Sequence, residues 1–212
     1  MTRPFLISTL FVIFALGMDL VIMGSSNLSE LLPAFSNGFD WRKFLLWLIF
    51  PIILYRLLKL PQKISFSFNE IQKKDWLIIL FISLLAGLSM LLIPHIDALN
   101  QYYVQRGEVS FEQKIAFIKF QSLWIFSWAF GWEYLIRFFW LNSFEERHLS
   151  KAIYILPIIE VLYHFNKPWP EILGVLALSL FLVGWTIKRR NMLPAMLTHL
   201  LIEFILIFYL II

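Results

Sequence analysis

The sequence predicts an all-α, polytopic membrane protein built as a bundle of transmembrane helices. Of its 212 residues, 60% are hydrophobic and only 15% are charged. A soluble domain of this length could not bury so much apolar surface. The apolar stretches are long and unbroken, which favours helices over the alternating segments of about 10 residues that build membrane barrels.

Seven apolar segments predict about seven spans. They cover residues 4–23, 41–60, 76–94, 114–141, 152–165, 171–187 and 193–212. A spanning helix needs about 20 residues, which the first three segments and the last provide. The fourth is long, so its outer end extends beyond the hydrocarbon, and the fifth is short. Between the fifth and the sixth, Pro168 and Pro170 disfavour a continuous helix.

We find no internal repeat, so residues 1–212 are predicted to form a single integral membrane domain. The first segment lacks a clear small-residue cleavage pattern, and we interpret it as a transmembrane helix rather than a signal peptide. The stretch 56–75 fits either an amphipathic segment on the inner surface or a solvated basic loop.

Lysines and arginines in the loops predict the orientation, because cytoplasmic loops carry an excess of both. If the N-terminus is inside, the inner loops hold Arg3, Arg56, Lys59, Lys63, Lys73, Lys74, Arg147, Lys151, Lys188, Arg189 and Arg190. The outer loops then hold Arg42, Lys43, Arg106, Lys114 and Lys167. This asymmetry predicts a multi-pass protein of the inner (cytoplasmic) membrane with its N-terminus inside.

Charge and cysteine content narrow the function classes. The net charge of +4 is small and lies mostly in loops, where it carries topology rather than nucleic-acid binding. The expected partners are the lipid bilayer and a membrane-anchored protein or peptide substrate, with no nucleic acid. The chain has no cysteine, which excludes thiol catalysis and thiolate metal ligands.

Three polar pairs stand out within the apolar second half of the chain. They are Glu133 with Arg137, Glu160 with His164, and His199 with Glu203. Each pair has i, i+4 spacing, which places both side chains on one helical face. Ionisable groups at membrane depth are costly and normally face a cavity, a partner or a substrate path.

The predicted depths of these residues favour one shared site. At about 1.5 Å per residue, all but Arg137 lie about 9–18 Å from the inner ends of their helices. Arg137 lies about 6 Å deep by the same reckoning. The sequence therefore predicts a common site that opens toward the cytoplasmic leaflet.

Each pair also has a structural interpretation. Glu133 and Arg137 fit an ion pair that locks a helix, or a carboxylate held for catalysis. A lone histidine in an apolar helix is more often a hydrogen-bonded core residue, although a carboxylate beside His164 or His199 fixes its tautomer. Glu171 fits an interfacial turn, or a carboxylate that dips into the cavity.

No metal or other cofactor is predicted for this site. Two histidines with nearby carboxylates suit Zn²⁺ in principle. The spacing around His199 is HxxxE and not HExxH, so the zinc-protease signature is absent, and a metal site is the less economical interpretation.

At the three pairs, over residues 115–212, the chain resembles the CPBP family of intramembrane proteases (CAAX protease and bacteriocin-processing, or Abi). That family carries Glu-Glu-x-x-x-Arg, Phe-x-x-x-His and His-x-x-x-Asn/Asp on successive helices. Glu133 and Arg137 match the second Glu and the Arg of the first motif, and His164 and His199 match the two histidines. The resemblance makes residues 115–212 the protease-like core.

Three positions depart from the family pattern. Trp132 replaces the first Glu, which the family uses to activate water, Glu160 replaces the Phe, and Glu203 replaces the Asn or Asp. The chain is similar to divergent bacterial members in which a single Glu precedes the Arg.

The resemblance implies an intramembrane endopeptidase that cuts a peptide bond near the C-terminal or membrane-anchored part of its substrate. Glu133, or failing that Glu160, would activate water, and both histidines would stabilise the oxyanion or carry the proton. Arg137 and Glu203 would orient their neighbours.

Because Trp132 replaces the first Glu, a second hypothesis is that the protein is a catalytically inactive relative that acts as a membrane scaffold or bacteriocin-immunity factor. A proton-coupled carrier is the third hypothesis, and the lack of repeated halves argues against it.

Overall fold

The computed structural model describes residues 2–24, 38–103 and 110–210, and within these residues the chain is helical with one isolated bridge, between Ser65 and Asn191. The all-α prediction is therefore confirmed for this part of the chain. Arg106 and the last two residues of the seventh predicted segment lie outside the described residues.

Every predicted apolar segment coincides with helix. The longer helices are α1 (Arg3–Gly24), α4 (Phe50–Leu57), α5 (Lys73–Met90), α7 (Phe111–Glu133), α9 (Ala152–Tyr163), α10 (Trp169–Arg189) and α11 (Leu193–Tyr209). Shorter α-helices are α3 (Trp41–Phe44), α6 (Asp97–Tyr103) and α8 (Leu141–Ser143). Two π-helices, η2 (Leu45–Ile49) and η5 (Tyr134–Trp140), continue α3 and α7, and 3₁₀ turns are η3 (Phe68–Glu70), η4 (Ile93–His95) and η6 (Glu146–Lys151).

Within the described residues, three helices are long and apolar enough to cross a membrane. These are Arg3–Ile22, Lys73–His95 and Trp169–Arg189, and Leu193–Tyr209 is apolar but shorter. Their length and composition support a membrane location. The count of seven spans and the orientation of the N-terminus stay predictions.

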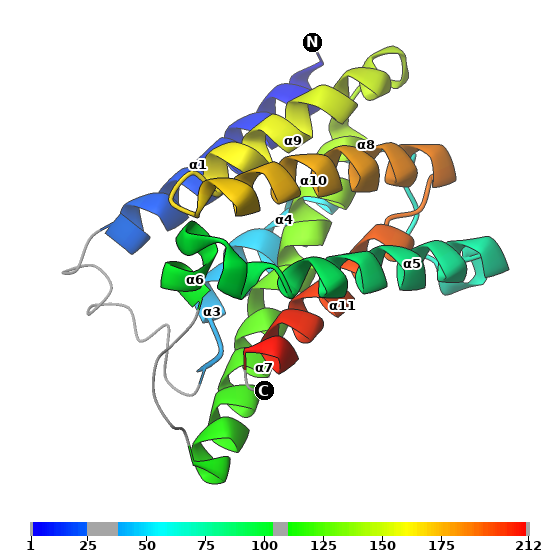
Figure 1. Ribbon diagram of the computed structural model, residues 1–212. Helices are drawn as coiled ribbons and strands as arrows, with labels where there is room; N and C mark the ends of the chain where they lie inside the picture. The colour runs from blue at the N-terminus through cyan, green and yellow to red at the C-terminus, as the bar shows by residue number, and fades with distance from the viewer. Residues whose placement is uncertain (1, 25–37, 104–109, 211–212) are drawn as a thin grey trace.

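Neighbouring helices pack in both orientations: α9 and α10 are antiparallel, whereas α5 and α11 both begin near the Asp75–Arg189 pair and run parallel. Figure 1 shows α9 and α10 as a hairpin, with α5 and α11 packed together beside it and the long α7 running behind them. The hairpin turns after Tyr163, where Pro168 ends the extended link and α10 begins at Trp169. The predicted proline break between the fifth and sixth segments is confirmed.

Four chain segments meet at one end of the bundle. We call it the strap end, after the segment 58–72, which we call the strap. Arg189 pairs with Asp75 at 2.8 Å, and Arg190 hydrogen-bonds to Glu146. The N-terminus of α1 lies at the same end (Figure 1), together with the strap itself, residues 58–72. All of these segments were assigned to the inner side by their lysines and arginines.

The strap is anchored to the bundle rather than freely solvated. The backbone N–H of Ile64 donates to Oδ1 of Asn142 at 2.8 Å, and Nδ2 of Asn142 donates to the Ile64 carbonyl at 3.2 Å. The Ile64 side chain is fully buried in the main hydrophobic cluster. The buried Ile64 side chain and the Asn142 hydrogen bonds together hold this basic stretch against the helices.

A glycine sets the separation between α7 and η2. A Cβ built on Gly131 would lie 3.1 Å from Cβ of Trp47, which is closer than side chains normally pack. Gly131 therefore lets the backbone of α7 approach η2 closely. This contact fixes the position of Trp132 and Glu133, the next two residues of α7.

Candidate active site

Glu133 is the last residue of α7 and is fully buried. The π-helix η5 begins at the next residue. A π-helical turn contains an additional residue and changes the direction of the side chains that follow, and such turns often occur at functional sites. Glu133 therefore lies at a break in helix geometry deep within the bundle.

Arg137 joins Glu133 to α9. Its Nη1 lies 2.5 Å from Oε1 of Glu133, and its Nη2 lies 2.7 Å from Oε1 of Glu160. The guanidinium is fully buried and bridges carboxylates that are 27 residues apart in sequence. Two hydrogen-bonded anions offset the cost of burying the guanidinium charge.

His199 joins Glu133 to α11. Its Nδ1 lies 2.6 Å from Oε1 of Glu133, and its Nε2 lies 3.7 Å from Oε1 of Glu203. The edge of the ring packs against Trp128, with ring centroids 5.8 Å apart. Five of the six predicted site residues thus form one connected ionic network across three helical segments.

His164, the sixth predicted site residue, has a different partner from the one predicted. Its Nδ1 lies 2.8 Å from the backbone carbonyl of Glu160, which fixes Nδ1 as the protonated nitrogen. The Glu160 carboxylate turns to Arg137 instead. The prediction that this carboxylate fixes the histidine tautomer is therefore wrong, because a buried guanidinium is the stronger competitor for it.

Trp132 fills the place of the first motif Glu with an aromatic side chain. It is buried between Trp47 and Tyr163, at centroid distances of 5.3 and 5.0 Å. Its ring also meets the edge of His164 at 6.4 Å. The contact with the Trp132 ring therefore places His164 beside position 132, which directly precedes Glu133 in the chain.

Glu133 has one oxygen that is held and one that is unpaired. Both Arg137 and His199 contact Oε1, whereas Oε2 has no hydrogen-bond partner among the described residues. A buried carboxylate oxygen without a donor is costly, so a donor brought to this oxygen would be bound favourably. A water molecule or a substrate N–H has the required chemistry.

Residues 116–205 match the family model described as type II CAAX prenyl endopeptidase Rce1-like. This match supports the resemblance of the chain to the CPBP family. The matched segment runs from α7 into α11 and contains all six predicted site residues. No curated protein and no solved structure matches the chain.

The matched family is one of membrane endopeptidases that act on protein substrates, and the match therefore supports a peptidase function in general terms. Among the residues that the structure describes, no group of three or more His, Asp or Glu side chains is arranged to hold a metal ion. The donors around Glu133 are instead a guanidinium and an imidazole.

Sequence reasoning missed a second buried ionic cluster. Asp19 of α1 is fully buried and lies 2.7 Å from Arg42 Nη2 and 3.6 Å from Lys43 Nζ. The Tyr163 hydroxyl donates a hydrogen bond to the same carboxylate. A lone aspartate inside an apolar, membrane-length helix was the signal that could have revealed it.

The Asp19 cluster also accounts for two of the cations that the sequence assigned to the outer loops. Arg42 and Lys43 were counted as outer-loop charges, yet both side chains are nearly buried and paired with Asp19. Buried, neutralised charges do not follow the loop rule.

Glu171 lies within the protein rather than on a freely solvated turn. Tyr103 of α6 donates to Oε2 of Glu171 at 2.5 Å, and Lys167 Nζ lies 3.7 Å from Oε1. The Lys167 ammonium also packs over the Tyr102 ring, 4.8 Å from its centroid. We refer to Tyr103, Lys167 and Glu171 as the Glu171 cluster.

Proposed function

We propose that the protein is an intramembrane endopeptidase in which Glu133 activates water for peptide hydrolysis. The observation that carries this proposal is the two-sided environment of its carboxylate. Oε1 is held by Arg137 and His199, and Oε2 is free to accept a hydrogen bond. A general base must be fixed in position and still reach the proton that it removes.

In this mechanism Oε2 takes a proton from water while the oxygen of that water attacks the scissile carbonyl carbon. The carbonyl oxygen becomes an oxyanion, which His199, or His164 in its doubly protonated form, stabilises by donating a hydrogen bond from Nε2. Glu133 then gives the proton to the leaving nitrogen as the C–N bond breaks. Arg137 holds the Glu133 carboxyl group in position throughout.

Glu160 is the second choice for the base. Its Oε1 is bound to Arg137, as the corresponding oxygen of Glu133 is. Glu133 is favoured because Arg137 and His199 hold its carboxylate from two different helices. Among the described contacts, the Glu160 carboxylate is held by Arg137 alone. Glu203 orients His199 from the outer side of its ring.

The proposal is tested with a farnesylated peptide that ends in a CAAX sequence, presented in liposomes with the purified protein. This probe follows from the description of the matching family. Wild type is compared with Glu133→Gln and His164→Ala, and released peptide is quantified by mass spectrometry. We expect both variants to lose cleavage by about 10² or more.

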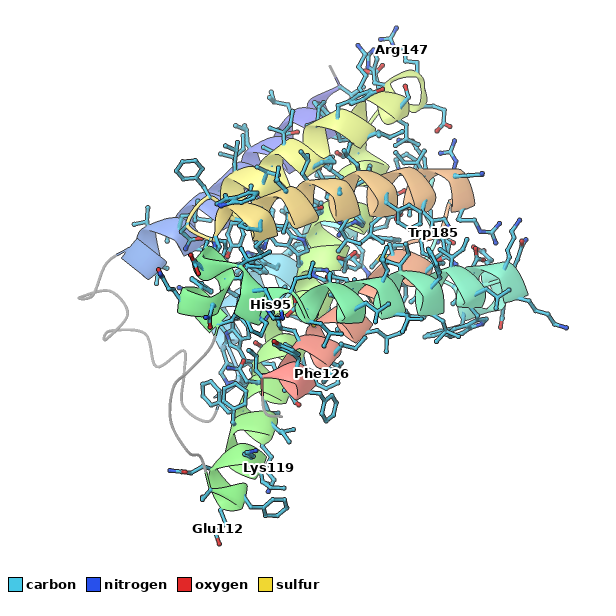
Figure 2. The ribbon with its side chains drawn as sticks, viewed as in Figure 1. His95, Glu112, Lys119, Phe126, Arg147 and Trp185 are labelled. Atoms are coloured by element: carbon cyan, nitrogen blue, oxygen red, sulfur yellow. The ribbon has the colours of Figure 1, made fainter. Side chains whose placement is uncertain are left out.

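A matched control is Glu112→Gln, because Glu112 is an exposed carboxylate in the first turn of the same helix (Figure 2). It should cleave as wild type does. Equal cleavage by wild type, Glu133→Gln and His164→Ala would remove this site from the mechanism.

A non-catalytic scaffold or immunity factor is the second candidate, and one observation favours it. The position of the first motif Glu holds a buried tryptophan packed between two aromatic rings. That position offers no carboxylate. A wild-type protein that cleaves no membrane-anchored substrate, and whose biological effect survives Glu133→Gln, would establish this alternative.

A further inference from the structure

The buried site extends toward one end of the bundle through polar side chains. Along α11, His199 and then Glu203 lie progressively farther from the strap end, where this helix begins at Leu193. The Glu171 cluster lies at the start of α10 and the end of α6, opposite the strap. Glu203 is close enough to Tyr103 and Lys167 to interact with both electrostatically.

Exposure rises along the same direction. The side chain of Glu133 is 0% exposed, that of His199 16%, that of Glu203 23% and that of Lys167 30%. Glu171, between Tyr103 and Lys167, is 20% exposed. Charged groups at partial exposure within an apolar bundle favour contact with water rather than with lipid tails.

The strap end of the site is apolar by contrast. Leu135, Ile136 and Phe139 follow Glu133 toward that end and are fully buried. Leu193 and Met196 precede His199 on α11 and are buried in the same hydrophobic cluster. Beyond them the strap covers the bundle with Ile64.

We propose that Glu203 and the Glu171 cluster form a hydrated entrance through which water and protons reach the buried Glu133–His199 pair. The unpaired Oε2 of Glu133 is the buried acceptor that such an entrance would supply. The entrance opens at the end opposite the strap, which is the reverse of the opening predicted from helix depths. This inference does not depend on the proposed peptidase activity.

The chain is well suited to a direct test, because it contains no cysteine and any introduced thiol is therefore unique. The probe is a charged, membrane-impermeant methanethiosulfonate reagent applied to sealed vesicles that contain Glu203→Cys. Thiols react as thiolates, which form in water and not in lipid. Fast labelling therefore reports hydration of the site.

Leu201→Cys is the matched control. Leu201 lies on the same helix and is 38% exposed, which is more than Glu203, but the two side chains point in different directions around the helix. We expect Glu203→Cys to react about tenfold faster or more than Leu201→Cys. Equal rates would mean that Glu203 faces lipid and would overturn the entrance.

Two exposed positions identify the face from which the reagent enters. Arg147→Cys marks the strap end, where Arg147 projects from the molecule (Figure 2), and Asn166→Cys marks the turn beside Lys167. Glu203→Cys should label from the same side as Asn166→Cys. Labelling from the Arg147 side would overturn the proposal.

Tyr103→Cys provides a second probe should Glu203→Cys not fold. It lies in the Glu171 cluster on a different helix and should show the same sidedness and rate advantage. Thermal melting in detergent establishes the fold of each variant. A folded Tyr103→Cys protein that labels no faster than Leu201→Cys would equally overturn the entrance.

Discussion

His199 Nδ1 and Arg137 Nη1 meet at the same oxygen of Glu133, at 2.6 and 2.5 Å. One carboxylate oxygen thus joins α11 to the α7–η5 helix, and the same guanidinium continues the connection to α9 through Glu160. The network is both a candidate catalytic apparatus and an internal brace of the bundle. Substitutions can separate the contribution of the network to the stability of the fold from its proposed role in catalysis.

Arg137→Met is expected to destabilise the protein by about 3–5 kcal/mol, because it leaves the buried Glu160 carboxylate without the cation that it contacts and Glu133 with His199 alone. The measurement is reversible unfolding in mixed micelles. Arg147→Met removes an exposed ion pair with Glu145 and should leave the unfolding midpoint unchanged. Equal midpoints for the two variants would show that the buried guanidinium is not a brace.

Asp19→Ala should cost about 3–5 kcal/mol as well, because Arg42 and Lys43 lose the anion that both of them contact. Ser8→Ala is the control within α1. Ser8 is also fully buried, but its hydroxyl has no hydrogen-bond partner among the described residues, so its removal should be nearly neutral. A neutral Asp19→Ala variant would mean that the cluster contributes nothing to stability.

Gly131→Ala should destabilise the bundle by about 1–3 kcal/mol, because the added methyl group would press on Trp47. The displacement should also lower activity, since Glu133 is two residues away. Gly184→Ala is the contrasting change, because no atom lies within 4 Å of the added Cβ in the middle of α10. It should stabilise the protein by about 0.5–1 kcal/mol. Thermal melting of both variants measures the difference.

Asn142→Ala should loosen the strap, because Lys63 and Ile64 donate their backbone N–H groups to its side-chain oxygen. Each unpaired donor costs about 1–3 kcal/mol. Limited trypsin digestion measures the effect as faster cleavage after Lys59 and Lys63. Asn166→Ala, in the exposed turn between α9 and α10, should be cleaved at the wild-type rate. Unchanged cleavage of Asn142→Ala would show that Ile64 alone holds the strap.

The strap end of the bundle also carries an exposed ion pair, between Arg190 and Glu146, on which pH has a local effect. The Arg190 guanidinium hydrogen-bonds to Glu146 and holds the pKa of that carboxyl below its usual value. A lowered pKa in the folded state means that this contact is present at neutral pH and is lost as the pH falls toward that pKa. Both side chains are largely exposed, so the loss should not unfold the protein.

The helices and the three polar pairs were readable from the sequence, because both depend on local patterns. Apolar run length gave each helix, Pro168 gave the break after α9, and i, i+4 spacing placed Glu133 and Arg137 on one face. Resemblance to the CPBP motifs singled out His164 and His199, and both lie within the residues that the family model matches. None of these inferences required knowledge of how the helices pack.

Only the tertiary structure decided which groups are partners. Spacing paired Glu160 with His164, but the packing of α9 against η5 gives the Glu160 carboxylate to Arg137. Asp19 and Arg42 meet across different helices, and no sequence period links them. A helix fixes the direction of its side chains locally, whereas the crossing of two helices depends on close contacts such as that of Gly131 with Trp47, which form only when the whole bundle assembles.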